Sequence, residues 1–180
     1  IPRVKTVGSI AGIVWLCALV ITLIFGFKLV NSFRGSGEFT QEHPIALNPN
    51  DTLFIVADNI LDLNKWGRNG TFYFDDARLA IKNDPQVIYG IPVLKFKASH
   101  DSTAAIYITT NARGSNTEDA IETAERVEYK WRQNNDTLFL SDHFNLAPGE
   151  KWRKQETRVE VELPEGTNVS IDKNLRPILG

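Results

Sequence analysis

One uninterrupted apolar stretch, residues 7–27, dominates the hydrophobic pattern of the chain. It contains no charged residue and no proline, and it lies between Lys5 and Lys28. A bilayer core requires about 20 consecutive apolar residues in helical form, because a helix rises only about 1.5 Å per residue. The pattern therefore predicts a single transmembrane helix.

Two other interpretations of this stretch are weaker. A buried core helix of this length would carry a polar stripe, and the stretch has none. A cleaved signal peptide could use Arg3 and Lys5 as its basic region, but its apolar part should span about 7–15 residues and end in small residues. Here the run is longer and continues into Phe25, Phe27 and Leu29, which favours a retained anchor.

Alternation of apolar and polar residues characterises most of the chain after residue 50. In residues 157–163, Val159, Val161 and Leu163 alternate with charged residues, which is the period of a half-buried antiparallel strand. On this basis strands are predicted at residues 52–57, 71–74, 78–82, 86–89, 93–98, 104–109, 129–132, 137–140, 157–163 and 168–172.

One helix is predicted within this strand-rich region. Ser115 and Glu118 have the spacing of a capping box, in which each side chain satisfies a backbone N–H of the first turn. Apolar side chains then recur on one face of the helix, at Ala120, Ile121, Ala124 and Val127.

A short motif occurs twice in the chain. NDTLF at residues 50–54 recurs at 135–139, and Asp58 and Trp66 have counterparts in Asp142 and Trp152. The repeat predicts two similar turn-and-strand units, each closed by a packed tryptophan. The expected fold class is therefore mainly β: a single transmembrane helix followed by a β-rich domain of repeated strand units, β-solenoid-like or sandwich, with one inserted α-helix.

Composition suggests how the chain is organised. Residues 31–50 contain Gly35, Gly37, Pro44 and Pro49 and no sustained period, which is typical of a linker. We expect a transmembrane anchor with short flanks at 1–34, a linker at 35–50 and a β-rich domain at 51–180. Because the chain starts at Ile1 and has no methionine, we also expect it to be part of a longer protein.

Charge separates the anchor from the rest of the chain. The basic residues Arg3, Lys5, Lys28 and Arg34 belong to the anchor, which has no acid, so the remainder of a chain with 20 basic and 22 acidic residues is acidic. An acidic domain argues against nucleic-acid binding. The single cysteine, Cys17, lies in the apolar stretch, so the domain forms no internal disulfide. Basic residues flank both ends of the helix, which leaves its orientation open.

The sequence indicates no catalytic, metal or cofactor site. His43, His100 and His143 lack the short spacings of metal ligands, and no nucleophile motif accompanies them. Neighbouring acids are more often solvated than catalytic. Three such pairs occur, Asp75 with Asp76, Glu118 with Asp119, and Glu160 with Glu162. We therefore expect a non-enzymatic protein.

Four residues are candidates for contact with a ligand or partner: Trp66, Trp131, Trp152 and Arg153. The tryptophans could form an aromatic platform for a glycan. Aromatic side chains favour strands and bury large areas, however, so core packing is the preferred interpretation. We expect Arg153 to pair with nearby acids at the surface end of a strand.

Several blocks in the second half of the chain occur in the order of a known family. They are ARGS at 112–115, the helix with Ala120, Ala124, Glu125 and Arg126, then Tyr129, DTL at 136–138, DHF at 142–144, WRKQE at 152–156 and LPEGT at 163–167. This order resembles the C-terminal periplasmic region of phage-shock-protein-C-like (PspC domain) membrane proteins of Bacteroidetes, a region similar to putative adhesin head domains. The resemblance covers residues 51–172 and is most specific at 112–167.

The resemblance implies an inner-membrane protein whose extracytoplasmic C-terminal domain lies in the periplasm and serves envelope stress or regulation. The expected function is that of a membrane-anchored, non-enzymatic sensor or scaffold that acts through protein contacts. The alternative is an adhesin-like or glycan-binding envelope module. Expected partners are the membrane and other proteins, with no cofactor and no nucleic acid for this portion, and homo-oligomerisation is left open.

Overall fold

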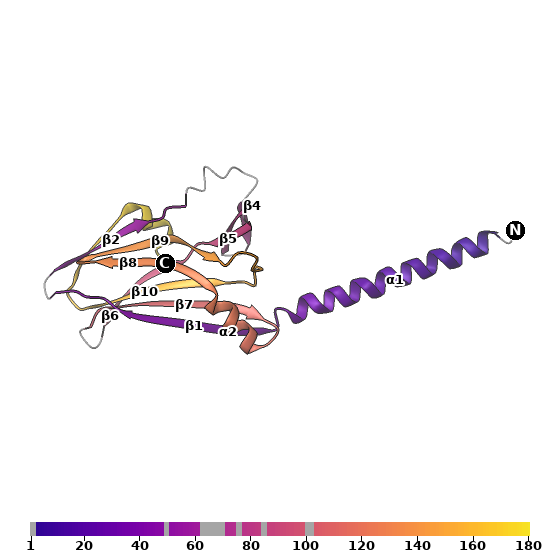
Figure 1. The fold of residues 1–180 in the computed structure, drawn as a ribbon, viewed down its shortest axis with the longest axis horizontal. Coiled ribbons are helices and arrows are strands. Elements are labelled where there is room, and N and C mark those ends of the chain that lie inside the picture. The colour runs from indigo at the N-terminus through magenta and orange to yellow at the C-terminus, as the bar shows by residue number, and fades with distance from the viewer. Residues whose placement is uncertain (1–2, 49–50, 62–70, 75–76, 84–85, 100–102) are drawn as a thin grey trace.

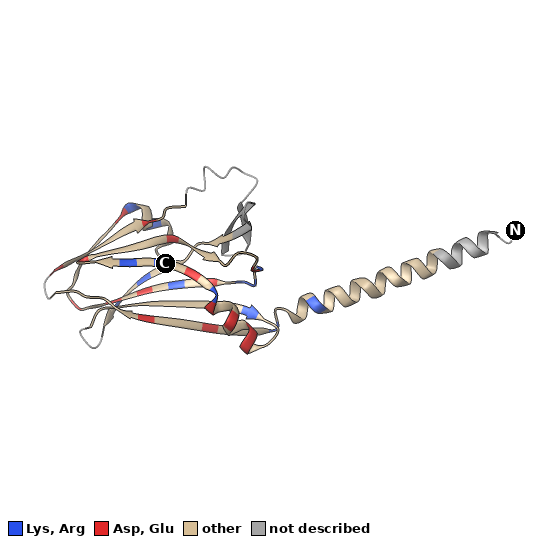
Figure 2. Ribbon diagram, in the orientation of Figure 1, with Lys and Arg blue, Asp and Glu red and all other residues tan. Residues whose placement is uncertain are grey.

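The first helix extends away from the rest of the protein. A computed structural model of the chain describes residues 3–48, 51–61, 71–74, 77–83, 86–99 and 103–180. Helix α1 spans Arg3–Asn31 and projects from one end of a β-rich body (Figure 1). Its part Ala11–Asn31 is long and apolar enough to cross a membrane, and the rest of the protein buries none of it. Lys28 is the one charge visible along this part (Figure 2). The predicted single candidate transmembrane helix is confirmed.

The β-rich body consists of two sheets. The four-stranded sheet has the order β1 (Gly35–Pro44), β7 (Ala105–Gly114), β10 (Glu156–Pro164) and β6 (Val93–Ser99). The seven-stranded sheet has the order β11 (Asn168–Ile171), β2 (Thr52–Asp58), β9 (Thr137–Leu146), β5 (Gln86–Gly90), β4 (Ala77–Asn83) and β3 (Thr71–Phe74), and β8 (Val127–Asn134) also pairs with β9. The described residues also form helix α2 (Thr117–Glu125) and the 3₁₀ helix η2 (Lys173–Ile178).

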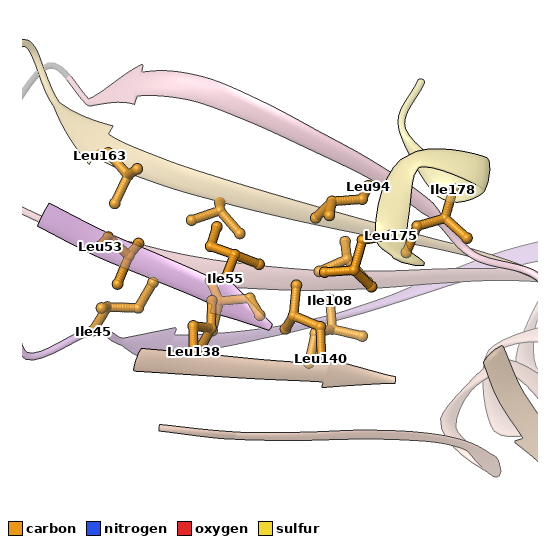
Figure 3. Packing of buried hydrophobic residues seen from close by; sticks show 13 residues of the cluster. Ile45, Leu53, Ile55, Leu94, Ile108, Leu138, Leu140, Leu163, Leu175 and Ile178 are labelled. Atoms are coloured by element: carbon orange, nitrogen blue, oxygen red, sulfur yellow. The ribbon is translucent and has the colours of Figure 1, made fainter. Parts of the chain in front are cut away.

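The two sheets face each other across one hydrophobic core (Figure 3). Its buried members are Ile45, Leu53, Ile55, Leu94, Ile106, Ile108, Leu138, Leu140, Val159, Val161, Leu163, Leu175 and Ile178. The alternation predicted for residues 157–163 is confirmed, because Val159 and Val161 are buried while Arg158 is exposed. The mainly β fold is thus confirmed, in the form of two packed sheets.

The repeated motif forms neighbouring parallel strands. Ile55 of β2 lies opposite Leu138 of β9, and Ile171 of β11 lies opposite Ile55 on the other side. The two copies therefore lie side by side in one sheet and contribute to the same core. Trp66, in the first copy, lies outside the described residues.

Most of the segment expected to be a linker is a strand. Residues 35–44 form β1, which pairs antiparallel with β7 along its whole length, from Gly35 opposite Gly114 to Pro44 opposite Ala105. Three residues, 32–34, separate the end of α1 from the start of β1. The helix therefore continues almost directly into the sheet.

The glycines of β1 and β7 allow α2 to lie directly on these strands. A Cβ atom at Gly37 would lie 2.5 Å from the backbone nitrogen of Ile121. Cβ atoms at Gly35 and Gly114 would collide with the backbone of α2 and its N-cap. Glycine here marks a close approach of backbones, which composition alone cannot distinguish from the flexibility of a linker.

The variant Gly37→Ala should destabilise the protein, because its methyl group would collide with the backbone of α2, which can move only as a whole helix. Overpacking of this kind costs about 1–3 kcal/mol in the free energy of unfolding. Urea unfolding of the detergent-solubilised chain, followed by circular dichroism, measures the loss. The matched control is Ser36→Ala, an exposed position on the same strand, which should unfold like the parent. Equal stability of both variants would contradict the packing of α2 on β1.

Candidate functional site: the junction of helix and sandwich

The elements nearest to α1 form a compact unit that we call the junction. It comprises the turn 32–34, the start of β1, the end of β7, α2 and Arg153. The turn continues the hydrogen bonding of α1, because the backbone nitrogen and the hydroxyl of Ser32 both donate to the carbonyl oxygen of Lys28, at 3.1 and 2.9 Å. Phe33 donates to Val30 at 3.2 Å. The helix thus ends in a hydrogen-bonded turn that leads into β1.

The start of α2 is capped by Asn116 and Asp119. The backbone N–H of Asp119 donates to the side-chain oxygen of Asn116 at 2.8 Å, while the Asp119 carboxylate accepts from the backbone N–H of Ser115 at 2.7 Å. The predicted capping box of Ser115 and Glu118 is therefore wrong by one residue. Val127, placed on the helix by its spacing, instead begins β8.

Arg153 holds the chain before β10 against α2 and β7. Its guanidinium donates to the Asp119 carboxylate at 2.8 Å, and the two side chains are 27% and 29% exposed. Its carbonyl oxygen accepts from the backbone N–H of Arg113 at 2.8 Å. The expected pairing of Arg153 with a nearby acid is thus present, and it serves to clamp the junction. Buried Gln155 supports the same segment by accepting from the Arg153 backbone N–H at 2.6 Å.

Asp119 is the electrostatic centre of the junction. Its pKa lies below the ordinary value, first because the backbone N–H of Ser115 donates to the carboxylate, then because of the Ser115 hydroxyl and the Arg153 charge. All of these interactions favour the ionised carboxylate. Acidic residues gather on α2 (Figure 2), but Asp119 is the acid of this helix that α2's N-cap and Arg153 both contact.

The other candidate contact residues do not join this unit. Trp131 on β8 packs against the main core, and its ring centroid lies 5.0 Å from that of His43 on β1. Trp152 packs against a smaller cluster formed by Ile88, Phe144 and Leu146. Trp66 lies outside the described residues. Trp131 and Trp152 are thus half-buried packing groups on different clusters.

A polar cluster interrupts the pairing of β8 with β9. The register shifts between Tyr129 and Trp131, so the three residues 141–143 of β9 bulge. The Asp142 carboxylate accepts from the Leu61 backbone N–H at 2.9 and 3.0 Å, which fastens the chain leaving β2. The Tyr129 hydroxyl donates to the Ser141 carbonyl at 2.9 Å, and burial followed by the Asp142 charge raises the pKa of this phenol.

The cluster lacks the geometry of a nucleophilic triad. Both the Ser141 hydroxyl, at 3.2 Å, and the Asp142 carboxylate, at 2.7 Å, lie against Nδ1 of His143. A Ser-His-Asp relay requires the carboxylate on one ring nitrogen and the hydroxyl on the other. What the contacts do in this structure is connect β9 with β8 and with the end of β2.

The remaining acids and histidines are dispersed. Glu160 and Glu162 on β10 both pair with Lys97 of β6, at 3.5 and 2.9 Å. Asp75, Asp76 and His100 lie outside the described residues. In the part of the chain that the structure describes, no three His, Cys, Asp or Glu side chains are placed to hold a metal ion.

Two solvent-open hollows lie at the end of the sandwich far from α1. One, of about 630 Å³, is bordered by Pro44 and Glu165, and the other, of about 850 Å³, by Gln133 and Asp136. Asp51 borders both. Neither hollow includes a residue of the junction.

Comparison with known proteins connects most of this body with a described domain. A family model described as ToastRack found in some PspC matches residues 81–179. The matched region contains β7, α2, Arg153 and η2, and therefore most of the junction. The chain matches no curated protein and no solved structure.

The variant Asp119→Asn should lower stability at neutral pH by about 1–2 kcal/mol, because charged hydrogen bonds to Ser115 and Arg153 weaken. Folding depresses the pKa of Asp119 below its ordinary value of 3.8. The contribution is therefore complete above that value and disappears as pH falls through the lower pKa of the folded state. Urea unfolding at pH 7 and below pH 3 should show a difference between parent and variant that shrinks in acid.

Glu118→Gln is the matched control for this variant, since it removes an exposed carboxylate from the same helical turn. It should leave the free energy of unfolding nearly unchanged at both pH values. A larger loss of unfolding free energy in Glu118→Gln than in Asp119→Asn would contradict the cap seen in the structure and favour the capping box predicted from the sequence.

Proposed function

Because the chain belongs to the family of toast-rack domains found in some PspC proteins, we propose that it is the periplasmic domain of an inner-membrane envelope-stress protein. The domain works without catalysis, as a sensor or scaffold that contacts other proteins. Helix α1 anchors it, with the sandwich on the periplasmic side and the N-terminal end of α1 toward the cytoplasm. Its acidic surface and single candidate span are compatible with this placement.

The observation that carries this proposal is the short connection between α1 and β1. A sensor must pass a change in its domain to the membrane segment, and a flexible tether would absorb that change. Here only residues 32–34 intervene, and α2 lies on the glycines of β1 just beyond them. A partner that shifts α2 or the Arg153 segment therefore acts on the strand that continues into α1.

The non-enzymatic part of the proposal draws on how the polar side chains are used. Asp119 and Arg153 clamp α2, Asp142 fastens the chain after β2, and Lys97 joins β6 to β10. These interactions connect elements of the sandwich and do not converge on one cavity. Such an arrangement suits a domain that presents surfaces to other proteins.

Reporter fusions test the proposed topology. Alkaline phosphatase fused after Gly180 should be active and a cytoplasmic fluorescent protein at the same place should be dark, because only the former folds in the periplasm. The reverse pattern should hold for fusions at Arg3. An active phosphatase at Arg3 together with an inactive one at Gly180 would contradict the proposed side of the membrane.

Insertion of a six-residue Gly-Ser segment between Asn31 and Gly35 tests the coupling. It should reduce the response of an envelope-stress reporter to membrane damage, since rotation and displacement of β1 no longer reach α1. The same insertion in the exposed turn between Glu165 and Gly166 is the control and should leave the response intact. An unchanged response with the first insertion would refute the hypothesis of a sensor that uses the junction, and the scaffold role would remain.

A further inference from the structure

The sandwich has two flanks, where the edge of one sheet lies beside the edge of the other. On the first flank, His43 of β1 meets Trp131 of β8, with 5.0 Å between ring centroids. Gln133 of β8 also accepts from the Ala46 backbone N–H at 3.1 Å, just beyond β1. This flank is closed by side chains of both sheets.

The opposite flank lies between β6 and β11, the last strands of the two sheets on that side. Helix η2 follows β11 and fills part of this flank with Leu175 and Ile178, which are 0% and 4% exposed. The chain then reaches β6, where Leu179 forms a parallel bridge with Leu94. Figure 3 shows Leu175 and Ile178 beside Leu94. One half of the flank is thus closed.

The half farther from α1 exposes apolar side chains that point inward. Phe96 pairs in register with Val161, Val169 with Leu53, and Ile171 with Ile55, and all three partners are buried in the core. Cross-strand neighbours share a face of the sheet. Phe96, Val169 and Ile171 nevertheless remain 36%, 37% and 37% exposed.

We call Phe96, Ala98, Val169 and Ile171 the open flank. These are core-facing positions of edge strands that the chain itself does not cover in the described structure. The sequence of β11, NVSI, contains neither charge nor proline, the usual protections of an edge strand. The edge strand β1 of the other flank, in contrast, carries Glu38, Glu42 and Pro44.

The anchor limits how a second copy could cover the open flank. Two copies in one bilayer must extend α1 in the same direction, so a two-fold axis relating them runs along the membrane normal. The strands run along the same direction as α1 (Figure 1). Antiparallel pairing of two β1 edges is excluded, because each β1 begins at its own α1 and the two anchors would point in opposite directions.

The directions of the two strands that border the open flank, β6 and β11, are compatible with this symmetry. β7 ends beside the start of β1, β10 runs antiparallel to β7, and β6 runs parallel to β10, so β6 points away from α1. β11 is parallel to β2 and begins after the far end of β10, so it points toward α1. A two-fold axis along the strands exchanges the two layers and places β6 of one copy beside β11 of the other, antiparallel.

We propose that the open flank is a homodimer interface, in which β6 of each copy pairs antiparallel with β11 of the other. Each sheet then continues into the partner's opposite sheet, and the four apolar side chains of each copy become buried. Both anchors enter the membrane on the same side. The proposal depends on the shared membrane and on the strand edges, and it holds whether or not the domain senses stress.

Cross-linking between differently tagged full-length copies tests the pairing directly. In a Cys17→Ser background, one copy carries Ala98→Cys and the other Val169→Cys, and both are co-expressed and oxidised in membranes. A disulfide between the two tags is expected. The control combines Val169→Cys with Thr40→Cys, which lies on the closed flank, and should give none. Cross-linking of the control at the same yield, or none in the test pair, would overturn the proposal.

Charge in the open flank should dissociate the dimer. Native mass spectrometry in detergent should show Val169→Lys weakening association by about tenfold or more, because each copy would bury a lysine without a partner. Thr40→Lys makes a similar change on exposed β1 and should remain dimeric, with both variants retaining the parent's circular dichroism. A monomeric parent, a dimer lost only through changes in α1, or a different protein cross-linked at residue 169 would each overturn it.

Discussion

The close approach of α2 to the glycines of β1 and β7 is the contact on which the rest of the structure depends. It requires that Gly35, Gly37 and Gly114 lack side chains, and it turns a stretch of linker-like composition into the edge strand of a sheet. Once β1 is in the sheet, the transmembrane helix and the sandwich are separated by a single turn. The ion pair of Arg153 with Asp119 also holds α2 in place. Helix α1 and the domain are thereby joined by a short turn that leads directly into a packed strand.

The elements that could be predicted from the sequence are those defined by local periodicity. The length of the apolar run predicts α1. The alternation in β10 predicts a strand, because burial of one face follows directly from the spacing of its apolar residues. β1 could not be predicted, because its glycines are required by the close approach of α2, which lies about eighty residues later in the chain. The cap of α2 was ambiguous for a similar reason. Ser115 with Glu118 and Asn116 with Asp119 have the same spacing, and the tertiary contact with Arg153 distinguishes them.

The candidate site likewise contains features that the sequence predicted and features that only the three-dimensional structure reveals. The pairing of Arg153 with an acid followed from its charge near a strand end, but its partner on α2 could be found only in three dimensions. The repeated motif predicted two similar units, and parallel β2 and β9 place them side by side. It did not predict that the strand expected at residues 168–172, which is β11, is a third parallel neighbour, because those residues do not repeat the motif. The pairing partner of a strand, unlike the strand itself, thus depends on contacts that its own residues do not specify.

The direct passage from α1 into β1 also determines how far the opposite end of the sandwich lies from the end of α1. β1 has ten residues, and at about 3.3 Å per residue it spans about 30 Å from its first residue to its last. In the proposed topology, with the strands directed along α1, the junction would lie at the level of the lipid head groups, whereas Pro44 and the hollows beside it would stand well clear of the bilayer. In that topology a molecule embedded in the membrane would be able to reach α2 and Arg153, while the far rim would be accessible only to molecules that extend beyond the lipid surface. The proposed topology would therefore give the two ends of one small domain different sets of neighbours.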